Sequence, residues 1–254
     1  MKIVVLPRRL MSAVACAAAA AAMFLLVSHP NAVGAAASKR ALPIYAVQTE
    51  EKKVALTFDA AWGNEDTQAL IDILGRHGVK ATFFLVGSWV DKYPESVKAL
   101  SDAGHSVQNH SNTHPHMTEL GPDAIAAEAN ACNDKIEAIT GLRPTLLRPP
   151  YGDYNDTVVN TIRSLGMEPI QWDTDSLDWK DLEAQEITKR VLEKVQPGSI
   201  VLFHNAALHT PEALPGIIQA LQDQGYTLCT VNELIYPQPY TIDHAGKQIP
   251  GAQQ

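Results

Sequence analysis

Several side chains that could do chemistry come at or just after the ends of apolar runs in the sequence. They are Asp59, His110, His114, Arg148, Asp175, Asp178 and His204. A charged group at the end of an apolar run costs free energy unless it is paired or functional. If the runs are parallel strands, their carboxyl ends meet at one edge of the fold, where active sites of such folds form. The pattern therefore predicts one catalytic site at strand ends.

Two of these residues have the spacing of metal ligands. His110 and His114 are four positions apart, so both imidazoles can reach one divalent cation from a helical turn or a tight loop. The alternative is a pair of surface or hydrogen-bonded loop histidines. For Asp59, the alternative to a catalytic role is a turn former or a helix cap. The residue types alone leave these alternatives open.

The elements that must position these residues alternate in type along the chain. The predicted strands are 54–58, 81–87, 105–108, 146–148, 169–172, 199–204 and 226–231. The predicted helices are 65–76, 93–103, 122–140, 155–165, 184–195 and 211–224. Strands that alternate with helices imply parallel crossovers in a single α/β domain. A barrel and an open doubly wound sheet both fit this alternation. No phosphate-binding glycine loop follows the first predicted strand, which argues against a nucleotide-binding fold.

The composition narrows the class of protein. The chain has 254 residues, 46% of them hydrophobic, which excludes a disordered polymer and suits one large α/β domain or two small ones. Its formal charge of −8 argues against nucleic acid as a partner. Cys132 and Cys229 are predicted to be buried free thiols, with a single disulfide between them as the alternative.

The N-terminal residues have the layout of an export signal. Basic residues precede an apolar run at 10–27, and small residues follow at 34–37. We expect 1–37 to be a cleaved signal peptide, with an uncleaved N-terminal membrane anchor through 10–27 as the alternative. In both cases the protein is predicted to be exported, either extracellular in the cell wall or anchored and facing outside.

Residues on both sides of the alternating region lack periodicity. The segment 38–50 is predicted to be a linker. The polar segment 237–254 is predicted to be a C-terminal tail that wraps the surface or is disordered. The catalytic domain is therefore expected at 51–236.

Five motifs occur in order within this domain. They are Thr57-Phe58-Asp59, His110-Ser111-Asn112-Thr113-His114, Arg148-Pro149-Pro150-Tyr151-Gly152, Asp175-Ser176-Leu177-Asp178-Trp179 and Leu202-Phe203-His204. Together they resemble the polysaccharide deacetylases of carbohydrate esterase family four, with the nodulation-type chitooligosaccharide deacetylase homology domain. The resemblance implies an irregular (β/α) barrel with about seven parallel strands. Trp62-Gly63 makes the chain most similar to secreted peptidoglycan deacetylases of spore-forming bacteria, which links it to sporulation.

The resemblance also implies roles for single residues. Asp59 would be the general base and His204 the general acid. Arg148 would keep Asp59 ionised, and Asp178 would hold the ring of His204 and raise its pKa. These types suit amide hydrolysis, because a water molecule must lose a proton and the amine must leave with one.

Further residues would bind the substrate and the metal. The backbone N–H of Tyr151, in a Pro-Pro-Tyr-Gly turn, would stabilise the oxyanion of the transition state. Leu202 and Trp179 would line the slot for the acetyl methyl group. His110 and His114 would be metal ligands.

One position departs from the family pattern. The residue after the base is typically a second aspartate and the third metal ligand, but here it is Ala60. Glu65 or Asp66 could replace it, although acidic residues there also favour the start of a helix. We expect a divalent metal, zinc first with cobalt or nickel as alternatives, in a site that Ala60 weakens.

The expected function is metal-assisted hydrolysis of N-acetyl groups on amino sugars of cell-wall glycan, of peptidoglycan type, with release of acetate. A xylan or chitin esterase is a variant of this function. The alternative is a non-catalytic barrel that has lost its metal and binds glycan or a wall-assembly partner. The joint presence of a base and an acid favours the enzyme, since a binder needs neither. For the enzyme, no protein partner is predicted.

Overall fold

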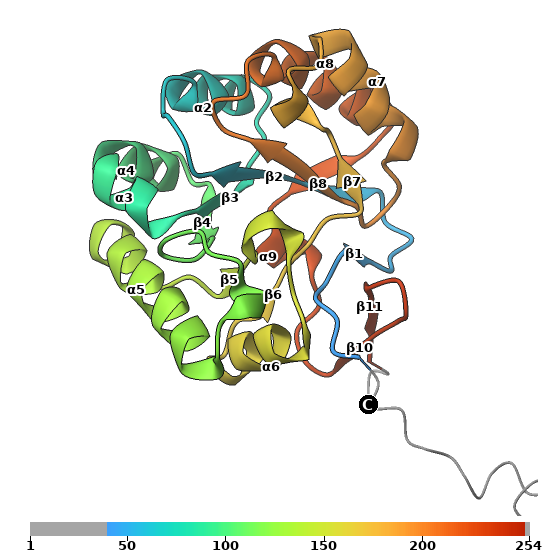
Figure 1. Ribbon diagram of the computed structural model, residues 1–254. Coiled ribbons are helices and arrows are strands. Elements are labelled where there is room, and N and C mark those ends of the chain that lie inside the picture. Colours follow the sequence, from blue (N-terminus) through green and yellow to red (C-terminus); the bar gives the residue numbers. More distant parts are fainter. Residues whose placement is uncertain (1–39, 252–254) are drawn as a thin grey trace, which may run out of the picture. The chain divides into compact units, whose positions relative to one another are not determined.

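The folded part of the chain is built on a parallel sheet. The computed structural model describes residues 40–251, and from Ala41 on they belong to one unit. The strands are β2 (Lys53–Ala60), β3 (Thr82–Leu85), β4 (Ser106–Asn109), β5 (Leu146–Leu147), β6 (Glu168–Pro169), β7 (Thr174–Asp175), β8 (Ile200–His204) and β9 (Thr227–Cys229). They run in the order β6-β5-β4-β3-β2-β8-β7, with β9 also paired to β2, and all pairings are parallel. The sheet curls into half of a barrel, which confirms the predicted fold class (Figure 1).

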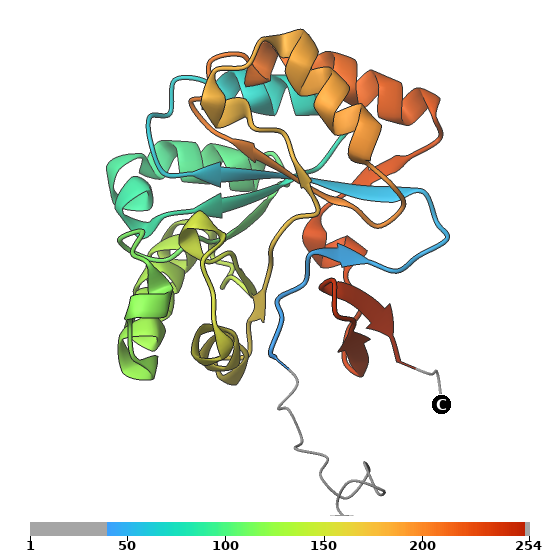
Figure 2. The ribbon, with the colours of Figure 1, turned by 45° about the vertical axis from the view of Figure 1, so that its right-hand side comes forward.

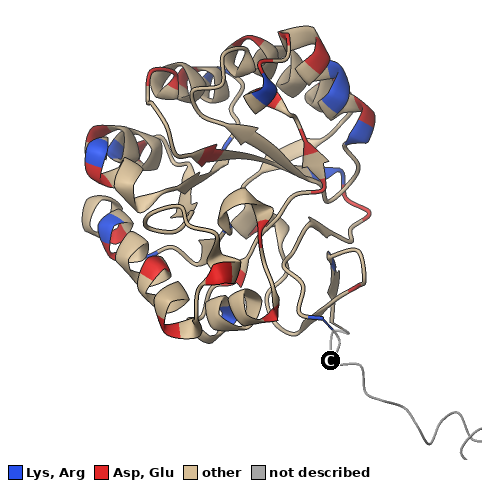
Figure 3. Ribbon diagram, viewed as in Figure 1, with Lys and Arg blue, Asp and Glu red and all other residues tan. Residues whose placement is uncertain are grey.

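Helices cover the outer side of this sheet (Figures 1 and 2). They are α2 (Thr67–Arg76), α3 (Gly87–Lys92), α4 (Pro94–Asp102), α5 (Pro122–Thr140), α6 (Asp156–Ser164), α7 (Ala184–Lys194) and α8 (Thr210–Asp223). The short α9 (Val231–Leu234) packs on the other face of the sheet, in a buried cluster with Ala55 and Phe84. Lys, Arg, Asp and Glu lie mainly on these helices (Figure 3). All six predicted helices are present, whereas the short α3 and α9 and the two-residue strand β7 were not predicted.

The alternation of side chains along β2 decides which groups face the barrel interior. Leu56 and Phe58 belong to a buried apolar cluster shared with α2, α4, α7 and α8. Phe58 stacks on Phe83 and Phe203, with ring centroids 4.8 and 5.4 Å away. Burial of each such ring contributes about 1.5–3 kcal/mol. Because successive side chains of a strand point to opposite faces, Asp59 is directed away from this cluster.

The segments expected to be a linker and a tail form a second sheet. It contains β1 (Ala46–Val47), β11 (Lys247–Pro250) and β10 (Tyr240–Ile242), in this order. Ile44 donates its N–H to the carbonyl of Pro169, and Val47 donates to that of Gly198, so the segment before β2 fills the space between β6 and β8. These hydrogen bonds join residues far apart in sequence, so local periodicity carried no sign of them. The predicted signal or anchor at 1–37 lies outside the described residues, and no helix within 40–251 is long and apolar enough to cross a membrane.

The two cysteines of the described region are buried and unpaired, as predicted. The Cys132 thiol donates to the carbonyl oxygen of Leu85 at 3.3 Å. Burial raises the pKa of Cys132 to about 12 and that of Cys229 to about 11, so both are protonated thiols at neutral pH. Their role is packing.

A buried histidine makes the stability of this fold depend on pH. His105 is 6% exposed, and its Nδ1 accepts the N–H of Ala81 at 3.2 Å. Burial lowers the pKa of His105 from 6.5 to about 4. Between pH 6.5 and about pH 4, His105 is therefore protonated in the unfolded chain but neutral in the folded chain. The free energy of unfolding falls as the pH drops through this range.

We expect His105→Gln, which keeps a neutral acceptor, to lose less stability on acidification than the wild type. Between pH 7 and pH 5 the difference should be about 2 kcal/mol, because this is the linkage free energy of the lowered pKa. The measurement is urea unfolding of both proteins at the two pH values. Parallel losses in both proteins would show that His105 is protonated in the folded state.

Candidate active site

Asp59 and Arg148 form a buried ion pair at the centre of the site. Asp59 lies near the C-terminal end of β2, and Arg148 directly follows β5. Arg148 Nη1 donates to Asp59 Oδ1 at 2.6 Å, and Arg148 and Asp59 are 0% and 5% exposed. Burial alone would raise the pKa of Asp59, but the charge of Arg148, together with that of protonated His204, outweighs burial and holds this pKa below its ordinary value. Asp59 is therefore ionised at neutral pH, which suits the role of general base expected for it.

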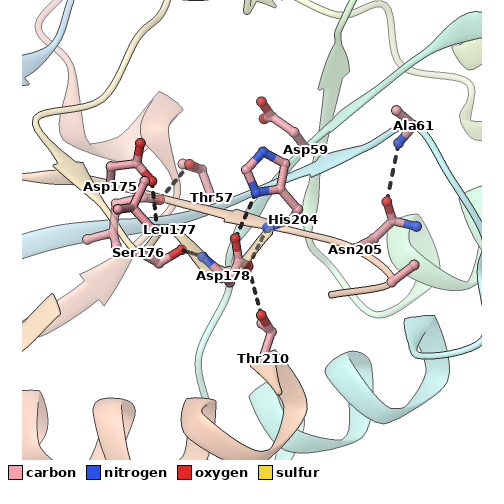
Figure 4. A network of polar contacts seen from close by, with 12 residues as sticks. Thr57, Asp59, Ala61, Asp175, Ser176, Leu177, Asp178, His204, Asn205 and Thr210 are labelled. Atoms are coloured by element: carbon pink, nitrogen blue, oxygen red, sulfur yellow. Dashed lines mark hydrogen bonds and ion pairs between the residues drawn. The ribbon is translucent and has the colours of Figure 1, made fainter. Parts of the chain in front are cut away.

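His204 lies beside Asp59 on the neighbouring strand. The two are register partners in β8 and β2, so their side chains leave the sheet on the same side. His204 Nδ1 donates to Oδ1 of Asp178 at 2.8 Å, and Oδ2 of Asp178 accepts from the backbone N–H of His204 and from Thr210 Oγ1. Figure 4 shows the imidazole between the carboxylates of Asp178 and Asp59. Burial disfavours its protonation, but the hydrogen bond and charge of Asp178 outweigh this effect and raise the pKa of His204.

His110 and His114 lie together next to the base. His110 Nδ1 donates to the carbonyl oxygen of Arg148 at 2.7 Å, so its Nε2 carries a lone pair and faces Asp59 Oδ2 at 3.5 Å. The two imidazole centroids are 5.0 Å apart. Burial lowers the pKa of His110, and it lowers that of His114 to about 4, so both rings are neutral. A neutral imidazole is a zinc ligand, which makes these two rings suitable donors.

No third metal ligand joins the two histidines in the described part of the chain. Ala60 packs in the apolar cluster under the helices. Asp66 turns to the loop after β8, where its Oδ2 accepts the N–H of Ala206 at 2.9 Å. Within 40–251, no three His, Cys, Asp or Glu residues, Glu65 included, are grouped as a metal site requires. Because catalytic zinc has three protein ligands, the residues present do not fit the metal that the resemblance implies.

Tyr151 lies in a tight turn after β5. The turn is the 3-10 segment η3 (Pro150–Gly152), and Tyr151 has a left-handed φ of 61°. Its ring contacts His114, with centroids 4.5 Å apart, and stacks on His116 at 4.2 Å. A left-handed conformation costs a residue with a side chain about 1–3 kcal/mol and is common at functional sites. The ring contacts therefore hold a strained turn beside the histidines.

These strand ends surround one cavity of about 460 Å³. Its lining residues are Asp59, Ala61, Trp62, His110, His114, Tyr151, Trp172, Asp175, Trp179, Leu202 and His204. The lining thus brings together Asp59 and His204, which are the expected base and acid, both histidines expected to bind metal, and the three residues expected to contact substrate. Arg148 and Asp178 do not line the cavity but form hydrogen bonds to Asp59 and His204, respectively. Glu65 and Asp66 are not among the lining residues.

Further residues line or support the cavity without an individual role expected from the motifs. Trp62, Trp172 and Asp175 line the cavity as well. Asn205, which is 5% exposed, accepts the N–H of Ala61 at 3.2 Å and donates to the carbonyl of Gly63 at 2.7 Å (Figure 4 shows the first contact). The only signal for Asn205 was its place directly after His204.

Comparisons with known proteins agree with this geometry. A family model described as polysaccharide deacetylase matches residues 46–170. The uncharacterized protein YlxY of Bacillus subtilis is 35% identical over 193 residues, which cover 76% of this chain but only 60% of YlxY. The peptidoglycan-N-acetylmuramic acid deacetylase PdaA of B. subtilis is 34% identical over 197 residues, which cover 76% of this chain and 74% of PdaA.

Two solved structures, of one protein and of its mutant, are also similar to this chain. BA3943 from Bacillus anthracis, described as a CE4 family pseudoenzyme, matches with a TM-score of 0.74 and 40% identity, over 76% of this chain and 69% of that chain. A mutant of BA3943, described as having restored enzymatic activity, matches with a TM-score of 0.73 and 41% identity, over 76% of this chain and 71% of that chain. The extent of the similarity to PdaA and the shared fold leave one conclusion: the chain belongs to the polysaccharide deacetylase family, carbohydrate esterase family four.

Proposed function

We propose that the chain hydrolyses the N-acetyl groups of amino sugars in peptidoglycan and releases acetate. The observation that carries the proposal is an ionised carboxylate, Asp59, beside an imidazole with a raised pKa, His204, on one cavity. Membership of the family supports a deacetylase. The substrate named for PdaA supports peptidoglycan, and the signal-like segment 1–37 supports export to the wall.

Asp59 is suited to activate a water molecule. Its Oδ1 accepts from Arg148, while its Oδ2 faces the lone pair of His110 Nε2 at 3.5 Å. Asp59 Oδ2 and His110 Nε2 are both hydrogen-bond acceptors, so a single water molecule can donate one hydrogen bond to each of them. Transfer of one of its protons to Asp59 makes this water the nucleophile for the acetyl carbonyl carbon.

His204 is suited to protonate the leaving amine. Its Nδ1 is held by Asp178, which leaves Nε2 for the cavity that the ring lines. When the tetrahedral intermediate collapses, a proton from Nε2 lets the sugar nitrogen leave as an amine. The N–H of Tyr151 would donate to the oxyanion, and Leu202 and Trp179 would contact the acetyl methyl group.

These steps use only groups of the chain. In the family, a divalent metal would polarise the acetyl carbonyl and lower the pKa of the attacking water. Because the third ligand is missing, we propose that zinc, cobalt or nickel binds only weakly at His110 and His114.

Removal of either catalytic group should abolish most of the activity. We expect Asp59→Asn and His204→Ala each to lower acetate release from peptidoglycan by about 10²–10⁴-fold, the usual contribution of acid–base catalysis. Asp173→Asn is the control, because the Asp173 carboxylate also accepts two hydrogen bonds, from Ser199 and Ile200, but does not line the cavity. Near-ultraviolet circular dichroism verifies folding. Full activity in a folded Asp59→Asn protein would contradict the assigned base.

The raised pKa of His204 should depend on Asp178. We expect Asp178→Asn to lower the pKa of His204, because it removes the negative charge that favours the imidazolium. Titration of the imidazole by NMR measures this without any need for turnover. Asp173→Asn should leave the value unchanged, and an unshifted His204 in Asp178→Asn would exclude Asp178 as the cause.

A carboxylate at position 60 should change how zinc affects stability. Ala60 is 1% exposed, so Ala60→Asp should destabilise the metal-free chain by about 1–3 kcal/mol or more. If the third ligand belongs at this position, zinc should raise the Tm of Ala60→Asp more than that of the wild type. His110→Ala in the same background should cancel the gain. An equal zinc effect on the wild type would mean that two histidines already suffice.

A further inference from the structure

One histidine of the loop that follows β4 has no part in the chemistry proposed above. His116 comes two positions after His114, but it does not line the reaction cavity, and its side chain is 53% exposed. Its ring nevertheless lies nearly parallel to the ring of Tyr151, with centroids 4.2 Å apart and planes inclined by 18°. Such stacking restricts how two rings can move against each other. His116 therefore contacts the turn η3 from outside the cavity.

A polar bridge joins the same histidine to the residue after this turn. His116 Nδ1 lies 3.3 Å from Asp153 Oδ2, and because a carboxylate only accepts hydrogen bonds, the imidazole is the donor. The same carboxylate oxygen accepts a second hydrogen bond from Thr118 Oγ1. The backbone N–H of Asp153 in turn donates to the carbonyl of Pro150 at 3.0 Å. These contacts tie the loop after β4 to the turn after β5.

Each of the two joined segments holds a residue in a strained conformation on the cavity. Tyr151 and His114 both have a φ of 61°, both line the cavity, and their rings are 4.5 Å apart. Residues with side chains keep a left-handed conformation only where their surroundings determine it. Tyr151 is 59% exposed, so packing against the core does not supply this constraint. The contacts with His114 and with His116 are what restrain its ring.

We propose that His116 and Asp153 are positioning residues for Tyr151. Together they hold η3 in the conformation in which the N–H of Tyr151 meets the oxyanion. This inference rests on the proposed function and deepens it, because it adds two residues outside the cavity to the machinery of the reaction. A donor that is already oriented needs no rearrangement in the transition state, so a fixed turn favours kcat. Substrate binding, which uses the walls of the cavity, depends on the turn much less.

The kinetic test removes each half of the bridge in the full chain. His116→Ala deletes the ring contact and the hydrogen bond, and Asp153→Ala deletes the acceptor. We expect each to lower kcat for acetate release from peptidoglycan about tenfold and to change KM by no more than about twofold, because a loosened donor loses part of its effect on the transition state. His116→Phe keeps the ring contact and Asp153→Asn keeps an acceptor oxygen, so each should retain more of the rate than the matching alanine variant.

Hydrogen exchange measures the turn itself without turnover. The N–H groups of Gly152 and Asp153 close the turn by donating to the carbonyls of Pro149 and Pro150. We expect both amides to exchange about tenfold faster in His116→Ala, because the turn opens more often, and NMR follows each amide separately. His77→Ala is the control for loss of an imidazole, because His77 follows α2 and does not line the cavity. It should change neither kcat nor these exchange rates.

The two readouts separate the failure of this inference from that of the proposed function. Unchanged kcat in His116→Ala and Asp153→Ala would overturn the positioning role and leave the proposed function standing. A lower kcat without faster exchange would also overturn it, because the turn would not have loosened. A wild type that releases no acetate would overturn the proposed function and this inference with it.

Discussion

The buried ion pair of Arg148 and Asp59 is the interaction on which the rest of the site depends. Arg148 is fully buried, its guanidinium lies over the rings of Phe84 and Trp172 at 4.2 and 5.5 Å, and it also donates to the carbonyl of Gln171. Removing two charges from water costs several kcal/mol for each ion, so such a pair persists only with close geometry. The pair therefore ties the end of β2 to the segments after β5 and β6, which are the walls of the cavity.

Alternating charges extend from this pair across the sheet. Arg148 is positive, Asp59 negative, His204 a cation when protonated, and Asp178 negative. Each charge lies next to one of opposite sign, so the interior holds four ionisable groups without a net charge to desolvate. The parallel register of β2 and β8 makes this possible, because it places Asp59 and His204 side by side. The same arrangement keeps the base ionised and the acid protonated at one pH.

Features that depend on neighbouring residues in the sequence could be predicted, whereas contacts between residues far apart in the sequence could not. The run before Asp59 and the run ending in His204 are strongly apolar, so both strands were predictable, and with them the place of the two side chains at one edge of the sheet. Asn205 bonds to residues 142 to 144 positions away, and no local pattern marks such a contact. The segment before β2 was missed for the same reason, since its hydrogen bonds run to the residues around β6 and β8. The motifs therefore located the residues that line one cavity, while the contacts that hold the walls of this cavity required the fold.

Ala60 can be tolerated in this architecture because the base does not depend on a metal for its charge. The pKa of Asp59 is lowered mainly by Arg148, a permanent cation that is part of the sheet wall. Loss of a third metal ligand at position 60 therefore leaves Asp59 ionised and His204 paired with Asp178. The methyl group also avoids a carboxylate in the apolar cluster under the helices, where an unpaired charge would oppose folding. The acid–base pair and the metal site are thus physically separable, and a chain that has lost one can keep the other.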